Sequence, residues 1–121
     1  VPLALPALEQ AVSYQKRAAR VGFDWPAIEG VKAKVTEELA ELEAAADEQE
    51  REHELGDVFF AVVNLARWLK VDAESALRKS NARFRKRFGR VEAGAARLGK
   101  ALKDMTLEEL DALWEEAKKK E

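Results

Sequence analysis

Four carboxylates on two expected helices have the spacing of a metal-binding set. Glu38 and Glu41 precede a twelve-residue spacer, residues 42–53, which leads to Glu54 and Asp57. Residues 31, 35, 38 and 42 follow the 4-3-4 spacing of a buried helix seam, and Glu38 occupies a seam position where leucine is expected. Because a lone buried glutamate is costly to desolvate, a compensating partner is expected beside it.

An antiparallel hairpin of these two helices would bring the four carboxylates together. They would repel one another strongly unless a cation neutralised them, and oxygen-only ligands suit a hard ion, Mg²⁺ or Mn²⁺. A solvated acidic face is the simpler alternative, but it fits the seam position of Glu38 poorly. A di-iron bundle would need two Glu-x-x-His motifs. The single His53 adjoins Glu54 instead, and we expect it at the surface.

Other polar residues allow more than one interpretation. Arg83 and Arg87 share one flank of a helix at i, i+4, where they could grip a triphosphate or extend around the core. Asn64 lies two turns beyond the acidic pair and could bind a ligand or serve as a satisfied core amide. Asn81 falls on the apolar side of its helix. Trp114 is more typical of a core than of a base-stacking platform.

The elements that position these residues are all expected to be helical, because no proline follows residue 26 and β-branched residues are few. Asp72 and Thr106 have the positions of helix caps. Short connections predict antiparallel neighbours in one bundle and one domain, residues 1–121. The expected helices span residues 5–21, 28–46, about 53–70, 73–98 and 107 to the end, with a charged connection at 47–52 between the second and third.

Composition narrows the chemistry. The chain has no cysteine and one histidine, which excludes thiolate chemistry and a histidine-rich metal site. The net charge of -2 argues against general binding to nucleic acid or to a membrane surface, and no apolar run is long enough to cross a membrane. A soluble, cytoplasmic protein is expected. The small net charge conceals ten acids and one base at 37–57, and seven bases without an acid at 78–90.

The acidic pattern resembles a known signature. Glu37-Glu38-x-x-Glu41, the spacer and Glu54-x-x-Asp57 are similar to the E-E-x-x-E…E-x-x-D motif of the MazG nucleoside triphosphate pyrophosphohydrolases, which belong to the all-α NTP pyrophosphatase superfamily. The surrounding segments at 15–25, 63–67, 83–88 and 107–118 resemble the C-terminal catalytic domain of MazG. The usual Lys-Phe-x-Arg-Arg-Phe is Arg-Phe-Arg-Lys-Arg-Phe at 83–88. The tandem N-terminal domain of full MazG is not in this sequence, which begins at Val1.

The resemblance implies a dimerising all-α bundle of about five helices that hydrolyses (d)NTPs to (d)NMP and pyrophosphate with Mg²⁺, in nucleotide-pool house-cleaning. It implies metal ligands at the four carboxylates named above and a water-activating or ion-holding role for Glu37. It implies substrate contacts at Lys34, Arg83, Arg87, Trp114 and Lys118. The implied assembly is a homodimer. The alternative is a helical module that binds nucleotides or dimerises without catalysis, and a glutamate in the seam argues against it.

Overall fold

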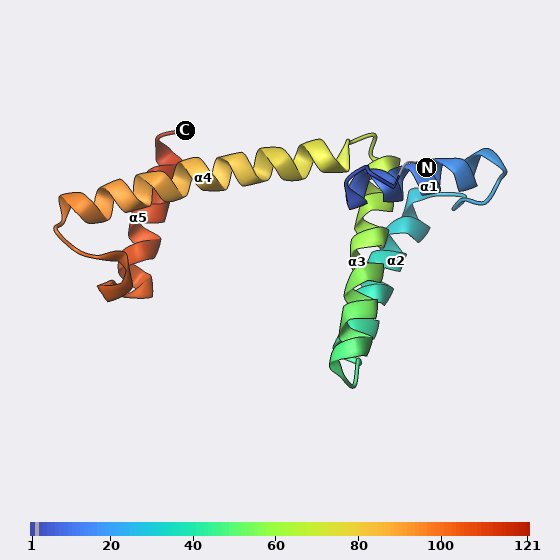
Figure 1. The fold of residues 1–121 in the computed structure, drawn as a ribbon, viewed down its shortest axis with the longest axis horizontal. Coiled ribbons are helices and arrows are strands. Elements are labelled where there is room, and N and C mark those ends of the chain that lie inside the picture. The colour runs from blue at the N-terminus through green and yellow to red at the C-terminus, as the bar shows by residue number, and fades with distance from the viewer. Residues whose placement is uncertain (2) are drawn as a thin grey trace. The chain divides into compact units, whose positions relative to one another are not determined.

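The computed structural model describes Val1 and residues 3–121, and these residues form helices without strands (Figure 1). The all-α prediction is therefore confirmed. The chain divides into two compact units, Val1–Ala76 and Leu77–Glu121. The helices are α1 (Ala7–Arg20), α2 (Ile28–Glu43), α3 (Glu48–Trp68), α4 (Ala73–Arg97), a short 3₁₀ helix η1 (Leu102–Asp104) and α5 (Leu107–Lys119).

Helices α2 and α3 form a hairpin, and they run side by side in Figure 1. Val31 of α2 and Val58, Ala61 and Val63 of α3 are buried in this unit. Helix α1 also packs against α3. Gln15 of α1 is buried, and its Nε2 donates a hydrogen bond to the backbone carbonyl of Phe60 at 3.0 Å. The α2–α3 hairpin, together with α1, is the scaffold that positions the acidic residues.

The expected connection at 47–52 is wrong, because α3 begins at Glu48. Asp47 is its N-cap, and its side chain accepts a hydrogen bond from the backbone N–H of Glu50 at 2.8 Å. The Glu50 carboxylate accepts in turn from the backbone N–H of Ala46 at 2.9 Å. Asp and Glu at this spacing satisfy free backbone donors at the start of a helix, so a charged stretch that resembled a loop is the first turn of α3.

The segment between α1 and α2 is held by one ion pair. Gly22 has φ +85°, which ends α1 as expected. The Asp24 carboxylate then accepts two hydrogen bonds from the Arg67 guanidinium, at 2.7 and 3.2 Å, and one from the Trp68 indole at 3.3 Å. The Arg67 guanidinium keeps the pKa of Asp24 below its usual range. This segment is thereby fixed to the end of α3.

The second unit contains most of α4, the 3₁₀ helix η1 and α5, and α5 crosses α4 in Figure 1. The Arg90 guanidinium of α4 donates a hydrogen bond to the Ala117 backbone carbonyl of α5 at 3.1 Å. Val91, Ala95, Met105 and Ala117 are buried in this unit. The capping box predicted at Thr106 is present, because its hydroxyl accepts from the Glu109 backbone N–H and the Glu109 carboxylate accepts from the Thr106 backbone N–H. The cap predicted at Asp72 also forms in the first unit, with the Ser75 backbone N–H donating at 3.2 Å.

Several apolar residues are more exposed than their spacing predicted. Within the largely apolar run at 58–66 of α3, Phe59 is 57% exposed and Val62 is 45% exposed. Asn81 of α4 is exposed rather than buried. These side chains stand on faces that no helix of their own unit covers, and periodicity alone does not reveal that. Among the described residues, no helix is both long and apolar enough to cross a membrane.

The cap of α3 gives a stability prediction. Asp47→Ala leaves the Glu50 backbone N–H without its acceptor, and we expect it to reduce the free energy of unfolding by about 1 kcal/mol. Asp47→Asn keeps an acceptor oxygen and should change the stability by a few tenths of that amount. Urea unfolding followed by circular dichroism measures both. Equal losses in the two variants would show that the charge, and not the cap, stabilises the helix.

Candidate metal centre

Glu38 is a buried carboxylate in the middle of the hairpin. Its residue is 5% exposed, which confirms the predicted seam position. The Lys34 ammonium lies one turn earlier on α2, with its Nζ 2.9 Å from Glu38 Oε1 and 3.5 Å from Glu37 Oε1. The hydrogen bond from Lys34 keeps the pKa of Glu38 below its usual range and raises the pKa of Lys34 itself. The compensating partner that the sequence required is therefore this lysine.

Three carboxylates converge between α2 and α3. Oxygens of Glu38, Glu41 and Glu54 all lie within 4.8 Å of one another. Hydrogen bonding and repulsion from Glu38, together with the charge of Glu54, raise the pKa of Glu41. Glu38 Oε2 and Glu54 Oε2 are buried and have no hydrogen-bond partner. One lysine is too little positive charge for this group, so the cluster is incomplete as it stands.

Asp57 and His53 extend the cluster along α3. One ligand atom each from His53, Glu54 and Asp57 lies within 4.8 Å of the others. The His53 side chain is 72% exposed, as expected, but its Nε2 lies 3.4 Å from Asp57 Oδ2. The sequence predicted a surface position for His53 but not its contact with Asp57. Its i, i+4 spacing to Asp57 was the available signal.

The donor set of these groups is suited to a metal ion. Carboxylate oxygens predominate, and hard divalent cations prefer such ligands. The two buried oxygens without partners are the observation that fits a cation, because each would gain a ligand bond in place of a missing hydrogen bond. The acidic groups on the hairpin can thus hold a metal ion.

The other predicted site residues divide between the two units. Asn64 lies on α3, and its Oδ1 accepts two hydrogen bonds from Arg67, at 2.8 and 3.0 Å. The amide oxygen of Asn64 is therefore satisfied within the protein, in agreement with the interpretation of Asn64 as a satisfied amide. The remaining residues lie in the second unit: Arg83, Arg87, Trp114 and Lys118.

Within the second unit, these residues form an aromatic and basic group. The Arg87 guanidinium forms a bidentate ion pair with the Glu121 carboxylate, which raises the pKa of Arg87. The same guanidinium lies 5.6 Å from the centre of the Trp114 ring, and Trp114 packs on Phe84 at 5.5 Å between ring centres. Lys118 Nζ lies 3.8 Å from a Glu115 oxygen. The Trp114 ring is thus in contact with the Arg87 guanidinium and the Phe84 ring.

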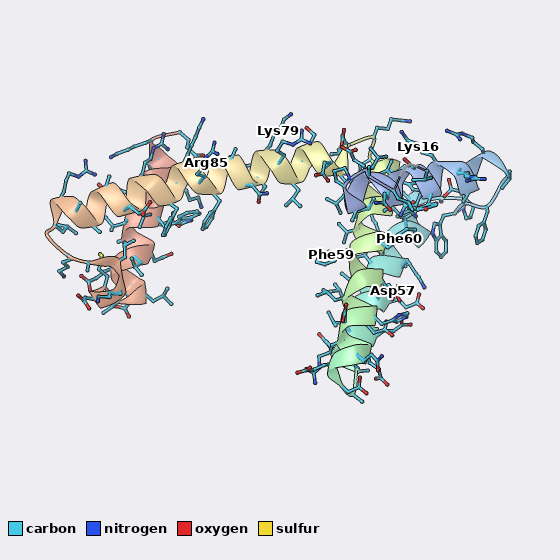
Figure 2. The ribbon with its side chains drawn as sticks, in the orientation of Figure 1. Lys16, Asp57, Phe59, Phe60, Lys79 and Arg85 are labelled. Carbon is cyan, nitrogen blue, oxygen red and sulfur yellow. The ribbon has the colours of Figure 1, made fainter. Side chains whose placement is uncertain are left out.

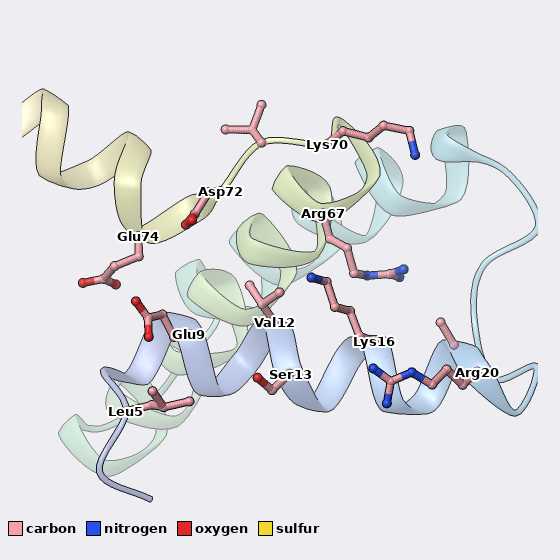
Figure 3. A pocket seen from close by; sticks show the side chains of 12 residues that line it. Leu5, Glu9, Val12, Ser13, Lys16, Arg20, Arg67, Lys70, Asp72 and Glu74 are labelled. Carbon is pink, nitrogen blue, oxygen red and sulfur yellow. The ribbon is translucent and has the colours of Figure 1, made fainter. Parts of the chain in front are cut away.

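Two cavities of the first unit lie beside α1. One, about 880 Å³ in volume, lies beside α1 and the end of α3 (Figure 3). Glu9 and Glu74 lie at one end of it, and Lys16 and Arg20 lie at the other. The other, about 540 Å³, has four aromatic side chains among its nine lining residues and is called the aromatic cavity below. Its lining residues are Tyr14, Gln15, Ala18, Phe23, Asp24, Trp25, Phe60, Asn64 and Arg67.

Sequence reasoning missed the aromatic cavity although one signal was present. Residues 8, 12, 15 and 19 have the same 4-3-4 spacing on α1 that singled out Glu38 on α2. Gln15 is the polar residue in that seam, and the structure buries it to 7% exposure with its Oε1 unpartnered. The aromatic partners come from α1 itself, from the turn that follows it and from α3, and no local pattern predicts such a meeting.

Comparison with known proteins identifies a family to which this chain is similar. Residues 27–91 match the model of the MazG nucleotide pyrophosphohydrolase domain. The chain is 47% identical to the nucleoside triphosphate pyrophosphohydrolase/pyrophosphatase MazG of Thermotoga maritima, over 94% of this chain and 45% of that protein. It is 42% identical to a nucleoside triphosphate pyrophosphohydrolase of Escherichia coli, over 100% of this chain and 48% of that protein.

A third relative is named only as an uncharacterized protein. This is YabN of Bacillus subtilis, which is 46% identical over the full chain and 26% of its own length. The chain thus spans less than half of the length of each of these three curated relatives. The matched segment 27–91 contains α2, α3 and most of α4, so it includes the whole acidic cluster and crosses the boundary between the two units.

The crowding of carboxylates predicts a pH-dependent stability in metal-free buffer. Because the folded state raises the pKa of Glu41, this carboxyl is protonated to a greater extent in the native protein than in the unfolded chain. Its contribution to stability declines as pH rises from about 4.5 through the folded pKa. Glu41→Gln should therefore raise the Tm at pH 7 and have a smaller effect near pH 4.5. Thermal melts with EDTA measure this, with Glu43→Gln as the control. A Tm gain that is equal at both pH values would contradict it.

Proposed function

Since the chain belongs to the MazG nucleotide pyrophosphohydrolase domain family, we propose that it hydrolyses nucleoside triphosphates to nucleoside monophosphates and pyrophosphate in a metal-dependent reaction. One observation carries the proposal: three carboxylates meet on the hairpin, and two of their buried oxygens have no hydrogen-bond partner. A triphosphate and a divalent cation bind one another through phosphate oxygens, so a hard-metal site is suited to this substrate. The relatives from T. maritima and E. coli are both named as nucleoside triphosphate pyrophosphohydrolases, which supports the same reaction.

The proposed metal ligands are Glu38, Glu41, Glu54 and Asp57. Their oxygens belong to two overlapping groups on α2 and α3, each within 4.8 Å. Mg²⁺ is the proposed ion, with Mn²⁺ as the alternative, and when bound it would neutralise phosphate charge and make a water molecule more acidic. The buried position of Glu38 holds its carboxylate in one place, which favours defined coordination.

Glu37 and Lys34 are the residues of the first unit that we propose to act at the reacting phosphate. Glu37 is exposed and lies beside the cluster, so its carboxylate could accept a proton from an attacking water. Lys34 is bound between Glu37 and Glu38 in this structure. Its ammonium is then available to pair with a phosphate oxygen once Glu38 binds the metal.

The second unit supplies the remaining proposed substrate contacts. Arg83 and Arg87 would neutralise charge on the phosphates, and Trp114 and Lys118 would contact the nucleotide. Arg87 and Trp114 are already in contact with each other. Asn64, whose oxygen is occupied by Arg67, would contribute only its amide N–H donors. We also propose that residues 1–121 act as one domain, which the family match across both units supports.

A homodimer is the proposed assembly. Leu55, Phe59, Val62 and Leu69 repeat at helical spacing on one face of α3, and each is between 41% and 57% exposed. Figure 2 shows Phe59 on one side of α3 and Asp57 with Phe60 on the other. A stripe of large apolar side chains in water is typical of a surface that a partner covers. We propose that the same stripe of a second copy covers it.

Removal of Glu38 tests the reaction. Glu38→Ala removes a ligand, and we expect kcat/KM for pyrophosphate release from ATP with Mg²⁺ to decline by more than the roughly 100-fold loss typical of an outer-shell partner. Glu43→Ala, an exposed glutamate of the same helix, is the matched control. Near-normal turnover by the Glu38 variant would refute the proposed site. Absence of pyrophosphate release by the wild type from a panel of canonical and modified NTPs would favour a nucleotide-binding module without catalysis.

A substitution in the exposed apolar stripe of α3 tests the proposed homodimer. Phe59→Glu places a charge among the exposed apolar side chains, and we expect the dimer Kd to rise about tenfold or more. Light scattering after size exclusion, over a range of concentrations, measures the equilibrium. Gln49→Glu adds the same charge to an exposed polar position on α3 and should leave the Kd unchanged. A monomeric wild type, or equal effects of the two variants, would contradict the proposal.

A further inference from the structure

We propose that the aromatic cavity of the first unit binds the base of a nucleotide, an inference that rests on the proposed hydrolysis of nucleoside triphosphates. Four of the chain's nine aromatic side chains (three Trp, one Tyr and five Phe) line this one cavity: Tyr14, Phe23, Trp25 and Phe60. Its volume of about 540 Å³ lies within the range of pockets that enclose small ligands, roughly 300–1,000 Å³. Planar aromatic surfaces of this kind bind bases by stacking, whatever the base.

Two helices lead from the acidic cluster to this cavity. On α3, Asp57, Phe60 and Asn64 share one face at i, i+3 and i+7, so the cavity residues follow the metal-binding residue within about 10 Å along the axis. Figure 2 shows Asp57 and Phe60 on the same side of α3. That separation is comparable to the distance from the base to the phosphates of an extended nucleotide.

On α2, the same order is repeated in the opposite chain direction. Glu38, Lys34 and Gly30 lie on one face at successive turns. A Cβ at Gly30 would stand 2.8 Å from Cε3 of the Trp25 ring, so this helix contacts a ring that lines the cavity. Helix α3 therefore carries a metal-binding carboxylate followed by residues of the cavity. Helix α2 carries a carboxylate, a cation for phosphate and the contact with Trp25.

The polar groups of the cavity suit a base rather than a purely apolar ligand. Gln15 is 7% exposed, and it uses its Nε2 on the Phe60 carbonyl while its buried Oε1 has no partner. A base carries N–H donors at its edge, and such a donor would satisfy this acceptor. Arg67, Asp24 and the Asn64 oxygen satisfy one another, so they provide a rigid wall.

The aromatic side chains are also unusually accessible for their size. Phe23 is 82% exposed, and Tyr14, Trp25 and Phe60 are each more than 40% exposed. Exposed aromatic rings that converge on one cavity have an apolar area that a flat ligand would cover. The Asp24–Arg67 ion pair fixes the turn that carries Phe23 and Trp25, so the cavity is formed before any ligand enters.

The test separates the base from the phosphates. Phe23→Ala removes an exposed ring, and we expect it to raise the KM for ATP by roughly 5- to 150-fold with kcat nearly unchanged. The Ki of inorganic tripolyphosphate as a competitor, which has no base, should not change. Val21→Ala is the matched control, because Val21 is 83% exposed in the same segment and does not line the cavity.

Other results would overturn the inference. An unchanged KM for ATP in Phe23→Ala would do so, and so would equal weakening of ATP and tripolyphosphate. A base-dependent loss in Trp114→Ala with none in Phe23→Ala would place the base in the second unit. If the wild type proves not to hydrolyse ATP, the proposed reaction fails separately. Calorimetric binding of α,β-methylene-ATP, weakened by Phe23→Ala but not by Val21→Ala, would still support the cavity.

Discussion

The arrangement of the first unit depends on a carboxylate buried where a helix hairpin needs an apolar side chain. Glu38 is desolvated in the seam of α2, and the Lys34 ammonium one turn away is its compensation. With Glu41 and Glu54 beside it, this single cation neutralises too little charge, and two buried oxygens stay without hydrogen bonds. A packed core would not retain such a group for stability alone. In the proposed function, a divalent cation would complete this group.

The sequence predicted the convergence of Glu38, Glu41 and Glu54 because the signals for it are local. A glutamate in a 4-3-4 seam can be recognised within one helix, and antiparallel pairing of two adjacent helices then brings the carboxylates together. The caps at Asp72 and Thr106 were predictable for the same reason, since each involves residues three positions apart. The sequence did not predict that α3 begins at Glu48. Residues 48–52 are all polar, so they contain no apolar periodicity that would indicate a helix.

The rest required information that a single helix pattern does not contain. Gln15 meets the Phe60 carbonyl across 45 positions of sequence, and Asp24 meets Arg67 across 43. The cavity between them exists only once α1, the turn and α3 are packed. Similarly, periodicity marks Phe59 and Val62 as apolar, but it does not say whether they contact their own unit or a partner. Burial depends on what faces a helix, and sequence periodicity describes only the helix.

Gly30 shows how the needs of a helix and of a neighbouring side chain can conflict. Glycine is a poor helix former, and in a helix interior it costs up to about 1 kcal/mol relative to alanine. Here it leaves the space in which the Trp25 indole lies against α2. Consensus or helix-propensity design, which replaces helical glycines by alanine to gain thermostability, would therefore target this residue and displace the ring. At position 30, alanine would favour the helix, but glycine is the residue that leaves the Trp25 ring in place beside the cavity.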